Sequence, residues 1–384
     1  MVHALAFESL SLCCKLNFMP IPLFVFTLIL LFGLLSYYLI FSCLSLPQEL
    51  PKQKVFISGV SIIICAKNEL ENLRKNIPIW LKQQQIEFEL VIVNHQSTDG
   101  SKAYLDDLKK QEKRLKVVHI ERAQTSALKG KRFPLSVGVE NAQYDYLVLS
   151  DADCCPNSRN HLFHITKPLA RGKDIVLGYS PYESRPGFVN RLVQYETTIT
   201  ALLYLSFARI GIPYMGVGRN LAYKKFLLSK DIFDQSNTAL GGDDDLIISK
   251  IANRINTAIS THPETFVFSH PPESFSQWIK QKQRHYSTAR QYDFFKILLI
   301  GGFGGLNFLF YISLLIMLFT KINLLIVLGL YLSKLFLFIM FNYKNLKVLK
   351  MLELIPRVIY LDIFWVIFLV YNHLKSLKAN NGWS

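Results

Sequence analysis

The segment at residues 20–46, PIPLFVFTLILLFGLLSYYLIFSCLSL, carries no charged side chain. A helix needs about 20 predominantly apolar residues to cross a bilayer, and this segment exceeds that length. A secretory signal peptide is the competing interpretation, but the apolar run is too long and no A-x-A cleavage site follows it. The segment therefore predicts a retained transmembrane anchor, and the rest of the chain has to fold beside a membrane.

Apolar sequence returns near the carboxyl end. Residues 296–319 and 322–341 are two predicted spans separated by a short turn. A third apolar segment, residues 355–374, contains Asp362, so we expect it either to span the membrane or to lie in the interface. Four basic residues lie in or near the loop before it: Lys344, Lys347, Lys350 and Arg357. We expect an integral membrane protein of a bacterial inner membrane. Because basic loops stay in the cytoplasm, we expect its central domain on the cytoplasmic side.

The net charge of +15 restricts the class of ligand. A basic chain can bind nucleic acid, anionic lipid or a phosphorylated ligand. The sequence carries no helix-turn-helix, zinc-finger or RNA-binding signature. Since 51% of the residues are hydrophobic and much of that excess looks membrane-embedded, lipid headgroups and phosphorylated ligands are expected rather than nucleic acid.

Between the apolar ends, strand-like and helix-like segments alternate. Short runs rich in β-branched and aromatic residues predict strands, which cover residues 55–66, 88–94, 115–120 and 144–150. Polar stretches between them predict helices, at residues 69–84 and 104–115. This alternation is typical of an α/β domain with a mostly parallel sheet flanked by helices. Ligands of such sheets bind beyond the carboxyl ends of the strands.

Asp151 and Asp153 follow the last of these strands. Residues two apart on a strand share a face, so both carboxylates can reach one ligand. Mg²⁺ and Mn²⁺ prefer such oxygen ligands and often share them with substrate phosphates. A solvated strand end explains the same dipeptide spacing equally well, so the spacing alone leaves the choice open.

A second acidic cluster, Asp243 to Asp245, lies between two glycines and an apolar run. Adjacent like charges raise the pKa of one member, which suits a general base. The alternative is a helix start, where aspartates stabilise the free backbone N–H groups. Both functions can hold within one cluster.

A basic segment at residues 277–287 precedes the C-terminal spans. Its cations, Lys280, Lys282, Arg284 and His285, predict either a juxtamembrane belt for lipid headgroups or a clamp on a phosphate leaving group.

Two polar turns follow strands in the first half of the domain. The strand that ends at Ala66 leads into Asn68 and Glu69 at a predicted helix start, and the next strand leads into Asn94 and a second turn. Such turns place helix N–H donors at the sheet edge, where a nucleotide can bind. Each turn by itself is an ordinary strand-to-helix connection.

Taken in order, these segments resemble the family 2 glycosyltransferases. The A-x-N-E pattern of that family matches Ala66, Asn68 and Glu69. Its V-D-D-G-S-T-D turn matches residues 93–99, and its G-K segment matches residues 130–131. The resemblance implies a GT-A fold, a Rossmann-like mixed sheet, in which these residues line the nucleotide site with Asn94 and Lys131 among them.

The later motifs of the family also follow in order. Its D-x-D matches residues 151–153, its acidic catalytic pair matches Asp243 and Asp244, and its Q-x-x-R-W matches residues 281–285. The resemblance covers about residues 60–285. The flanking spans are similar to those of ceramide glucosyltransferases and of bacterial polysaccharide and glycolipid glycosyltransferases.

The resemblance implies a role for each matched residue. Asp153 coordinates Mn²⁺ or Mg²⁺, and Asp151 binds the ribose or orients a water on the metal. Asp244, with Asp243 as the less favoured choice, deprotonates the acceptor. Gln281 and Arg284 close over the diphosphate and acceptor.

The chain departs from the family pattern at two places. The acidic pair of the second motif is Asn94-His95 here, and the final Trp of the last motif is His285. The first departure puts the usual contact to the base or ribose in doubt. The second makes stacking against a polymer end less secure, although His285 can still stack or donate a hydrogen bond.

Three functions are weighed on this basis. We favour an inverting glycosyltransferase that moves a sugar from a nucleotide-diphosphate sugar to a lipid or lipid-linked acceptor, because an acceptor in the bilayer explains anchors at both ends. A processive polysaccharide synthase is the first alternative. A non-catalytic membrane scaffold that retains the fold is the second. The expected organisation is a tail (1–19), an anchor (20–46), a cytoplasmic GT-A domain (55–291), a membrane region (296–374) and a second tail (375–384).

Overall fold

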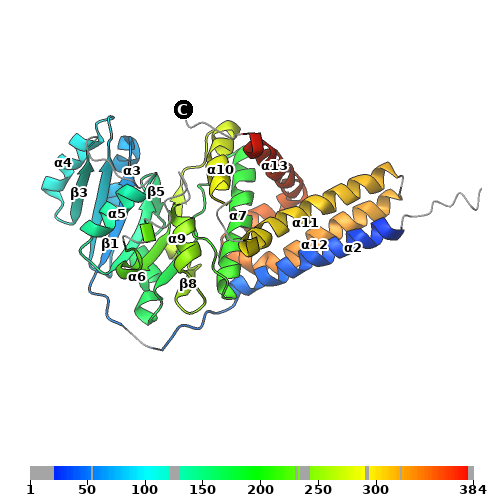
Figure 1. Ribbon diagram of the computed structural model, residues 1–384, viewed down its shortest axis with the longest axis horizontal. Helices are drawn as coiled ribbons and strands as arrows, with labels where there is room; N and C mark the ends of the chain where they lie inside the picture. Colours follow the sequence, from blue (N-terminus) through cyan, green and yellow to red (C-terminus); the bar gives the residue numbers. More distant parts are fainter. Residues whose placement is uncertain are drawn as a thin grey trace, which may run out of the picture.

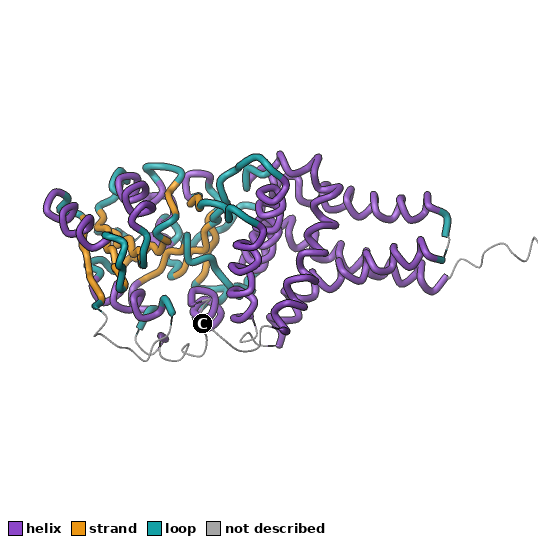
Figure 2. The backbone as a smooth tube through the Cα atoms, turned by 90° about the horizontal axis from the view of Figure 1, so that it is seen from above, coloured by secondary structure: helices purple, strands orange, loops and turns teal. Residues whose placement is uncertain are grey.

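We describe a computed structural model of the protein, in which residues 21–52, 55–121, 130–229, 232–233, 243–289, 294–320 and 322–378 are described. The predicted N-terminal tail and most of the second tail lie outside these ranges. Figure 1 shows two parts side by side: an α/β part with the strands, and a bundle of long helices that includes α2, α11 and α12. Seen from above, the bundle extends away from the strands (Figure 2).

Seven strands form one mixed sheet, in the order β3-β2-β1-β4-β7-β6-β8. Their bounds are β1 Val60–Ala66, β2 Phe88–His95, β3 Leu115–Ile120, β4 Tyr146–Asp151, β6 Ile175–Gly178, β7 Leu221–Lys224 and β8 Thr257–Ser260. The first four strands in the order run parallel, and β7 runs antiparallel to both β4 and β6. A second sheet pairs β5 (Cys154–Pro156) with β9 (Val267–Ser269). The predicted α/β class with a mixed, mostly parallel sheet is therefore confirmed.

Each face of the large sheet packs against its own helices. Ile62 and Ile64 of β1 belong to a core with α3 (Leu70–Trp80), α4 (Ser101–Gln111) and α6 (His161–Thr166). Ile63 points to the other face and packs with α5 (Arg132–Asn141) and α7 (Phe188–Arg209). This alternation explains the uninterrupted apolar sequence of β1, because a strand buried on both faces has no solvent side.

Short segments and helices complete the α/β part. They are η2 Leu169–Arg171, η3 Lys225–Leu227, α9 Asp243–Ile251, η4 Pro263–Thr265 and α10 Phe275–Ala289. The predicted third strand coincides with β3, whereas β1 begins at Val60 rather than at residue 55. The second predicted helix begins three residues earlier than expected, at Ser101 of α4.

Among the residues that the structure describes, four helical segments are long and apolar enough to cross a membrane: Ile21–Ser45, Phe294–Phe319, Leu324–Val348 and Leu352–Lys375. They comprise α2 Ile21–Ser42 with η1 Cys43–Ser45, α11 Phe294–Phe319, α12 Leu324–Val348, and η5 Leu352–Arg357 followed by α13 Val358–Lys378. The third apolar segment of the C-terminal region is thus also a helix of spanning length. The membrane side on which the α/β part lies stays a prediction.

Asp362 of α13 is buried among polar side chains from three other helices. It forms an ion pair with Lys334 of α12 and accepts hydrogen bonds from Tyr311 of α11 and, at 2.9 Å, from Tyr195 of α7. Lys334 also donates to the Tyr311 hydroxyl at 3.1 Å. A charge in an apolar helix is tolerated when it is paired inside a bundle, which accounts for an aspartate within a segment of spanning length.

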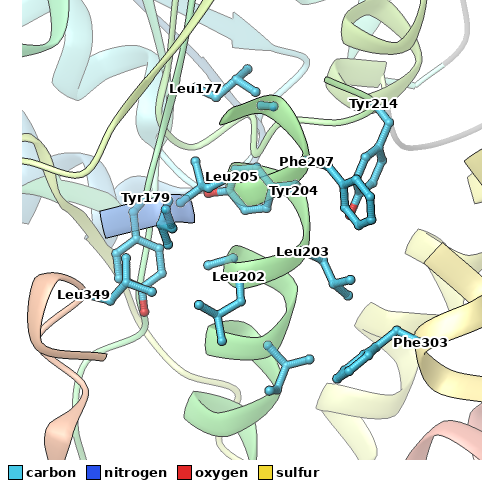
Figure 3. Close-up of a cluster of buried hydrophobic side chains, with 14 of the residues drawn as sticks. Leu177, Tyr179, Leu202, Leu203, Tyr204, Leu205, Phe207, Tyr214, Phe303 and Leu349 are labelled. Atoms are coloured by element: carbon cyan, nitrogen blue, oxygen red, sulfur yellow. The ribbon is translucent and has the colours of Figure 1, made fainter. Parts of the chain in front are cut away.

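Helix α7 joins the sheet to the bundle. The hydroxyl of Tyr204 donates a hydrogen bond to the Gly178 carbonyl of β6 at 2.7 Å, and the hydroxyl of Tyr195 donates one to Asp362 of α13. Figure 3 shows the buried side chains around it, with Leu177 near one end of the cluster and Phe303 of α11 on the side of the bundle. One apolar core therefore runs from the sheet through α7 into the helices of spanning length.

Candidate functional site

The loops after β1 and β2 are bonded to each other at the carboxyl edge of the sheet. Asn68 has a left-handed backbone with φ of 55°, and its N–H donates to Ser97 Oγ at 2.9 Å. Its side-chain Oδ1 accepts from the Thr98 N–H at 2.8 Å. Asn68 thus holds the two loops together, which is a function that an asparagine in this conformation commonly has.

Asp99 binds the first turns of two helices at once. One carboxylate oxygen accepts from the Leu70 N–H of α3 at 2.9 Å, and the other accepts from the Ser101 N–H of α4 at 3.1 Å. Free N–H groups at helix starts need such acceptors. Although burial opposes it, hydrogen bonding by Ser101 and Leu70 lowers the pKa of Asp99.

Glu69 lies half-buried on the same edge. Its carboxylate accepts from the Asn72 side chain at 2.5 Å. Burial raises the pKa of Glu69, Asn72 opposes that rise, and the nearby carboxylates of Asp153 and Asp151 add to it. These interactions place Glu69 near the predicted metal ligands.

Asn94 and His95, at the end of β2, lie on opposite faces of the sheet. Asn94 is buried on the α4 side, where its amide contacts His119 at 3.0 Å, and His119 contacts Asp106 of α4 at 2.9 Å. His95 lies on the α5 side, with its ring 6.4 Å from that of Phe133. Burial and Lys67 lower the pKa of His95, so its ring is neutral at pH 7. A nucleotide contact from Asn94 stays a prediction, and His95 is the more exposed of the two.

Helix α3 holds the backbone that carries the two predicted metal ligands. Asn76 donates to the Ala152 carbonyl at 2.8 Å, and Trp80 donates to the Cys154 carbonyl at 3.1 Å. Asp153 also accepts a hydrogen bond from Ser269 of β9 at 3.0 Å. The position of the carboxylates is therefore set by a buried helix and a second strand pair.

The donor set fits a divalent cation. One ligand atom from each of Asp151, Asp153 and Cys154 lies within 4.8 Å of the others. Burial, with Asp153 and Asp151 adding to it, raises the pKa of the Cys154 thiol, so this group stays protonated at neutral pH. The two carboxylates remain as ligands, and oxygen donors suit Mn²⁺ and Mg²⁺. Lys131 forms an ion pair with Asp151, which brings the predicted G-K segment to the same point.

Arg219 is a site residue that the sequence reasoning missed. It ends the G-V-G-R sequence before β7, and its backbone carbonyl accepts from Ser150 Oγ at 3.1 Å, one residue before Asp151. Its guanidinium lies 4.6 Å from the centre of the Tyr182 ring. The one signal in the sequence is a pair of glycines, Gly216 and Gly218, just before a basic residue.

Helix α10 brings Gln281 to this group. Gln281 accepts a hydrogen bond from the Tyr182 hydroxyl at 3.2 Å. Lys282 forms a 2.6 Å ion pair with the buried Glu196 of α7. Trp278 stacks on Phe368 of α13, with ring centroids 3.6 Å apart. The described part of α10 around Gln281 therefore lies between the sheet edge and a helix of spanning length.

Four predicted residues fall where the structure describes only the backbone. Helix α9 begins at Asp243, and Asp244 is its second residue, which agrees with the preference of aspartate for helix starts. Arg284 and His285 lie on α10, after Gln281. The side chains of all four lie outside the described part, so their chemical roles stay predictions. Ala66 ends β1 and is buried against the helices α3 and α4.

A second group of possible ligands does not form a metal site. The rings of His164 and His262 are stacked, with centroids 4.2 Å apart and planes 12° apart. Imidazole lone pairs lie in the ring plane, so two stacked rings cannot direct them at one ion. The adjacent Glu264 instead accepts hydrogen bonds from Ser158 at 2.6 Å and Asn160 at 2.9 Å.

A cleft of about 690 Å³ opens at the other edge of the sheet. Its lining includes Ser58, Phe88 and Arg114, which lie at the amino ends of β1, β2 and β3. Ligands of open α/β sheets bind at the carboxyl edge. The cleft is thus separate from the acidic site.

Comparisons with known proteins agree with this architecture. Residues 61–231 match the family model for glycosyl transferase family 2. A 97-residue stretch is 29% identical to the poly-beta-1,6-N-acetyl-D-glucosamine synthase of Staphylococcus epidermidis, which is 25% of this chain and only 22% of that protein.

A solved structure extends the likeness to nearly the whole chain. The mannosyltransferase PcManGT from Pyrobaculum calidifontis, in complex with GDP-Man and Mn²⁺, is similar with a TM-score of 0.61 at 16% identity, over 94% of this chain and 98% of that one. Glucosyl-3-phosphoglycerate synthase from Mycobacterium tuberculosis, in complex with Mn²⁺ and UDP, has a TM-score of 0.40 at 17% identity, over 59% and 77% of the two chains.

The fold is that of a GT-A glycosyltransferase, with apolar helices of spanning length before and after the sheet domain. The match of residues 61–231 to the family 2 glycosyltransferase model agrees with the family that the motifs resemble.

Proposed function

We propose that the protein transfers a sugar from a nucleotide-diphosphate sugar to an acceptor held in the membrane, with inversion at the anomeric carbon. The observation that carries this proposal is the meeting of two carboxylates, Lys131, Arg219 and Gln281 at the carboxyl edge of a family 2 domain. The complexes of the structural neighbours with nucleotides and Mn²⁺ support the donor class.

Asp151 and Asp153 would hold Mn²⁺ or Mg²⁺, which supplies positive charge to the departing diphosphate. Lys131 and Gln281 would orient the diphosphate around this point. Asp244 would take the proton of the acceptor hydroxyl as the acceptor oxygen bonds to the anomeric carbon. The bond from that carbon to the diphosphate breaks at the same time, and the nucleoside diphosphate leaves. A single displacement of this kind inverts the anomeric centre.

The acceptor class follows from the position of α10. Its stacking of Trp278 on Phe368 fixes the predicted clamp against a helix of spanning length. A soluble acceptor does not need that arrangement. We therefore expect a lipid or a lipid-linked glycan, bound where the domain meets the bilayer.

The test uses the full chain purified in detergent, a panel of nucleotide sugars and a lipid extract as acceptor. Asp153→Asn and Asp244→Asn should each abolish transfer, because one removes a metal ligand and the other removes the base. Asp245→Asn, in the same acidic cluster, is the matched control and should retain activity. Turnover near that of the wild type in Asp244→Asn would exclude it as the base.

A processive polysaccharide synthase is the second candidate, and the stretch shared with the Staphylococcus epidermidis synthase favours it. Product length separates the two candidates. A single added sugar supports simple transfer, and long polymers support the processive enzyme. Failure of the wild type to bind any nucleotide sugar in the presence of Mn²⁺ would instead point to a non-catalytic scaffold.

A further inference from the structure

Arg219 lies between the two halves of the site. One of its guanidinium nitrogens, Nη2, donates to the Ser180 carbonyl at 3.4 Å, and its plane rests over Tyr182. Tyr182 in turn contacts Gln281 of α10. Toward the metal ligands, the backbone carbonyl of Arg219 accepts a hydrogen bond from Ser150 Oγ, one residue before Asp151, at 3.1 Å. Arg219 therefore connects the predicted metal ligands to the predicted clamp.

The other terminal nitrogen of this guanidinium, Nη1, is buried and makes no hydrogen bond to the residues that the structure describes. A buried donor without an acceptor is costly, and more so on a charged group. Burial opposes the charge of Arg219, yet Tyr182, Cys154 and the two aspartates raise its pKa, so the group remains a cation. The acceptor for Nη1 then comes from outside the described residues, either from a ligand or from water.

The charges around Arg219 indicate what that ligand carries. The carboxylates of Asp151, Asp153 and Glu69 lie near the cations of Lys131 and Arg219. A divalent cation added to this group alone would give it a net positive charge. A cation that arrives with a diphosphate restores the balance. The group is thus suited to a metal and a diphosphate together rather than to either one separately.

We propose that Arg219 is a diphosphate-binding residue of this site, and that its Nη1 group donates to a phosphate oxygen of the nucleotide. This inference rests on the proposed function and adds a specific residue to it. Arginine suits the task because its planar fork can keep the bond to Ser180 while a second nitrogen binds a phosphate. The competing role is that Arg219 only neutralises the two aspartates.

The experiment measures nucleotide affinity by titration calorimetry on the full chain in detergent, with Mn²⁺ present. UDP, GDP, CDP and ADP are compared, and the matching nucleoside of the tightest binder serves as a phosphate-free probe. Arg219→Gln should weaken binding of the diphosphate by about 10- to 100-fold, the range expected for a hydrogen bond to a charged group. Binding of the nucleoside should not change. Arg74→Gln, an exposed arginine on α3, is the matched control and should bind as the wild type does.

The alternatives give different results. If Arg219 only neutralises the aspartates, Arg219→Gln will bind Mn²⁺ more tightly and the diphosphate within about twofold of the wild type, and the proposal is overturned. If Arg219→Gln does not fold, Arg219→Lys decides: a loss for the diphosphate but not for the nucleoside supports the contact, and wild-type affinity overturns it. Absence of nucleotide binding by the wild type itself would remove the proposed function and this inference together.

Discussion

Removing one charge from the Lys334–Asp362 pair should destabilise the protein strongly. Lys334 is fully buried and Asp362 is 6% exposed. Lys334→Met leaves the carboxylate of Asp362 with only the hydroxyls of Tyr195 and Tyr311. Breaking a buried ion pair in this way costs about 3–5 kcal/mol. We expect the lower end, about 3 kcal/mol, because two hydrogen bonds to the carboxylate remain.

A second change tests the cause of that loss. Asp362→Asn removes the charge and keeps one of the two oxygens to which the tyrosine hydroxyls donate. Alone it leaves Lys334 unpaired and should also destabilise. Combined with Lys334→Met it leaves no buried charge, so the double variant should recover most of the lost free energy.

The unfolding free energy can be measured for all four proteins by titration with sodium dodecyl sulfate in mixed micelles, followed by circular dichroism. Strong coupling between the two positions is the expected result. The reasoning would be refuted by single variants whose unfolding free energy lies within about 0.5 kcal/mol of the wild-type value. It would also be refuted by a double variant whose loss of unfolding free energy equals the sum of the two single losses.

Two smaller predictions concern local packing. Asp99→Ala should cost about 1–2 kcal/mol, since it removes one acceptor from the first turn of two helices, and thermal unfolding checks it. The lowered pKa of Asp99 means that its contribution is present above the ordinary carboxyl pKa and is lost as the pH falls through the lowered value. Gly302→Ala should destabilise the bundle by about 1–3 kcal/mol, because its new Cβ would lie 2.6 Å from the Tyr37 hydroxyl. Gly301→Ala, with nothing within 4 Å, is the control and should be neutral or stabilising; equal effects of the two alanines would contradict the packing argument.

The sequence predicted those parts of the fold that local patterns determine. The strand β3 was bounded correctly because its apolar residues are enclosed by charged ones. Helix α4 begins earlier than its periodicity suggests, because Asp99 supplies a cap from outside the helix. Helix α7 was not predicted from the sequence, and it is buried between the sheet and the bundle of long apolar helices.

Within the site, the predictable residues are those whose motifs are contiguous in sequence. Asp151 and Asp153 were predicted as metal ligands because one strand end carries both. Arg219 was not found, because its role arises from Tyr182 and the aspartates, which lie far from it in the chain. For the same reason, the sequence alone does not decide whether the final apolar segment spans the membrane or lies in the interface. The partner of its Asp362, Lys334, is on another helix.

The continuous core beneath α7 has a consequence for substrate choice under the proposed function. Helix α7 packs against both the sheet and the bundle, so under the proposed function the carboxylates lie at a fixed height above the lipid. An acceptor is then selected by the length of the stalk between its lipid tail and its reactive hydroxyl, as well as by its chemistry. Two lipids with identical terminal sugars but different stalks would be distinguished by geometry alone.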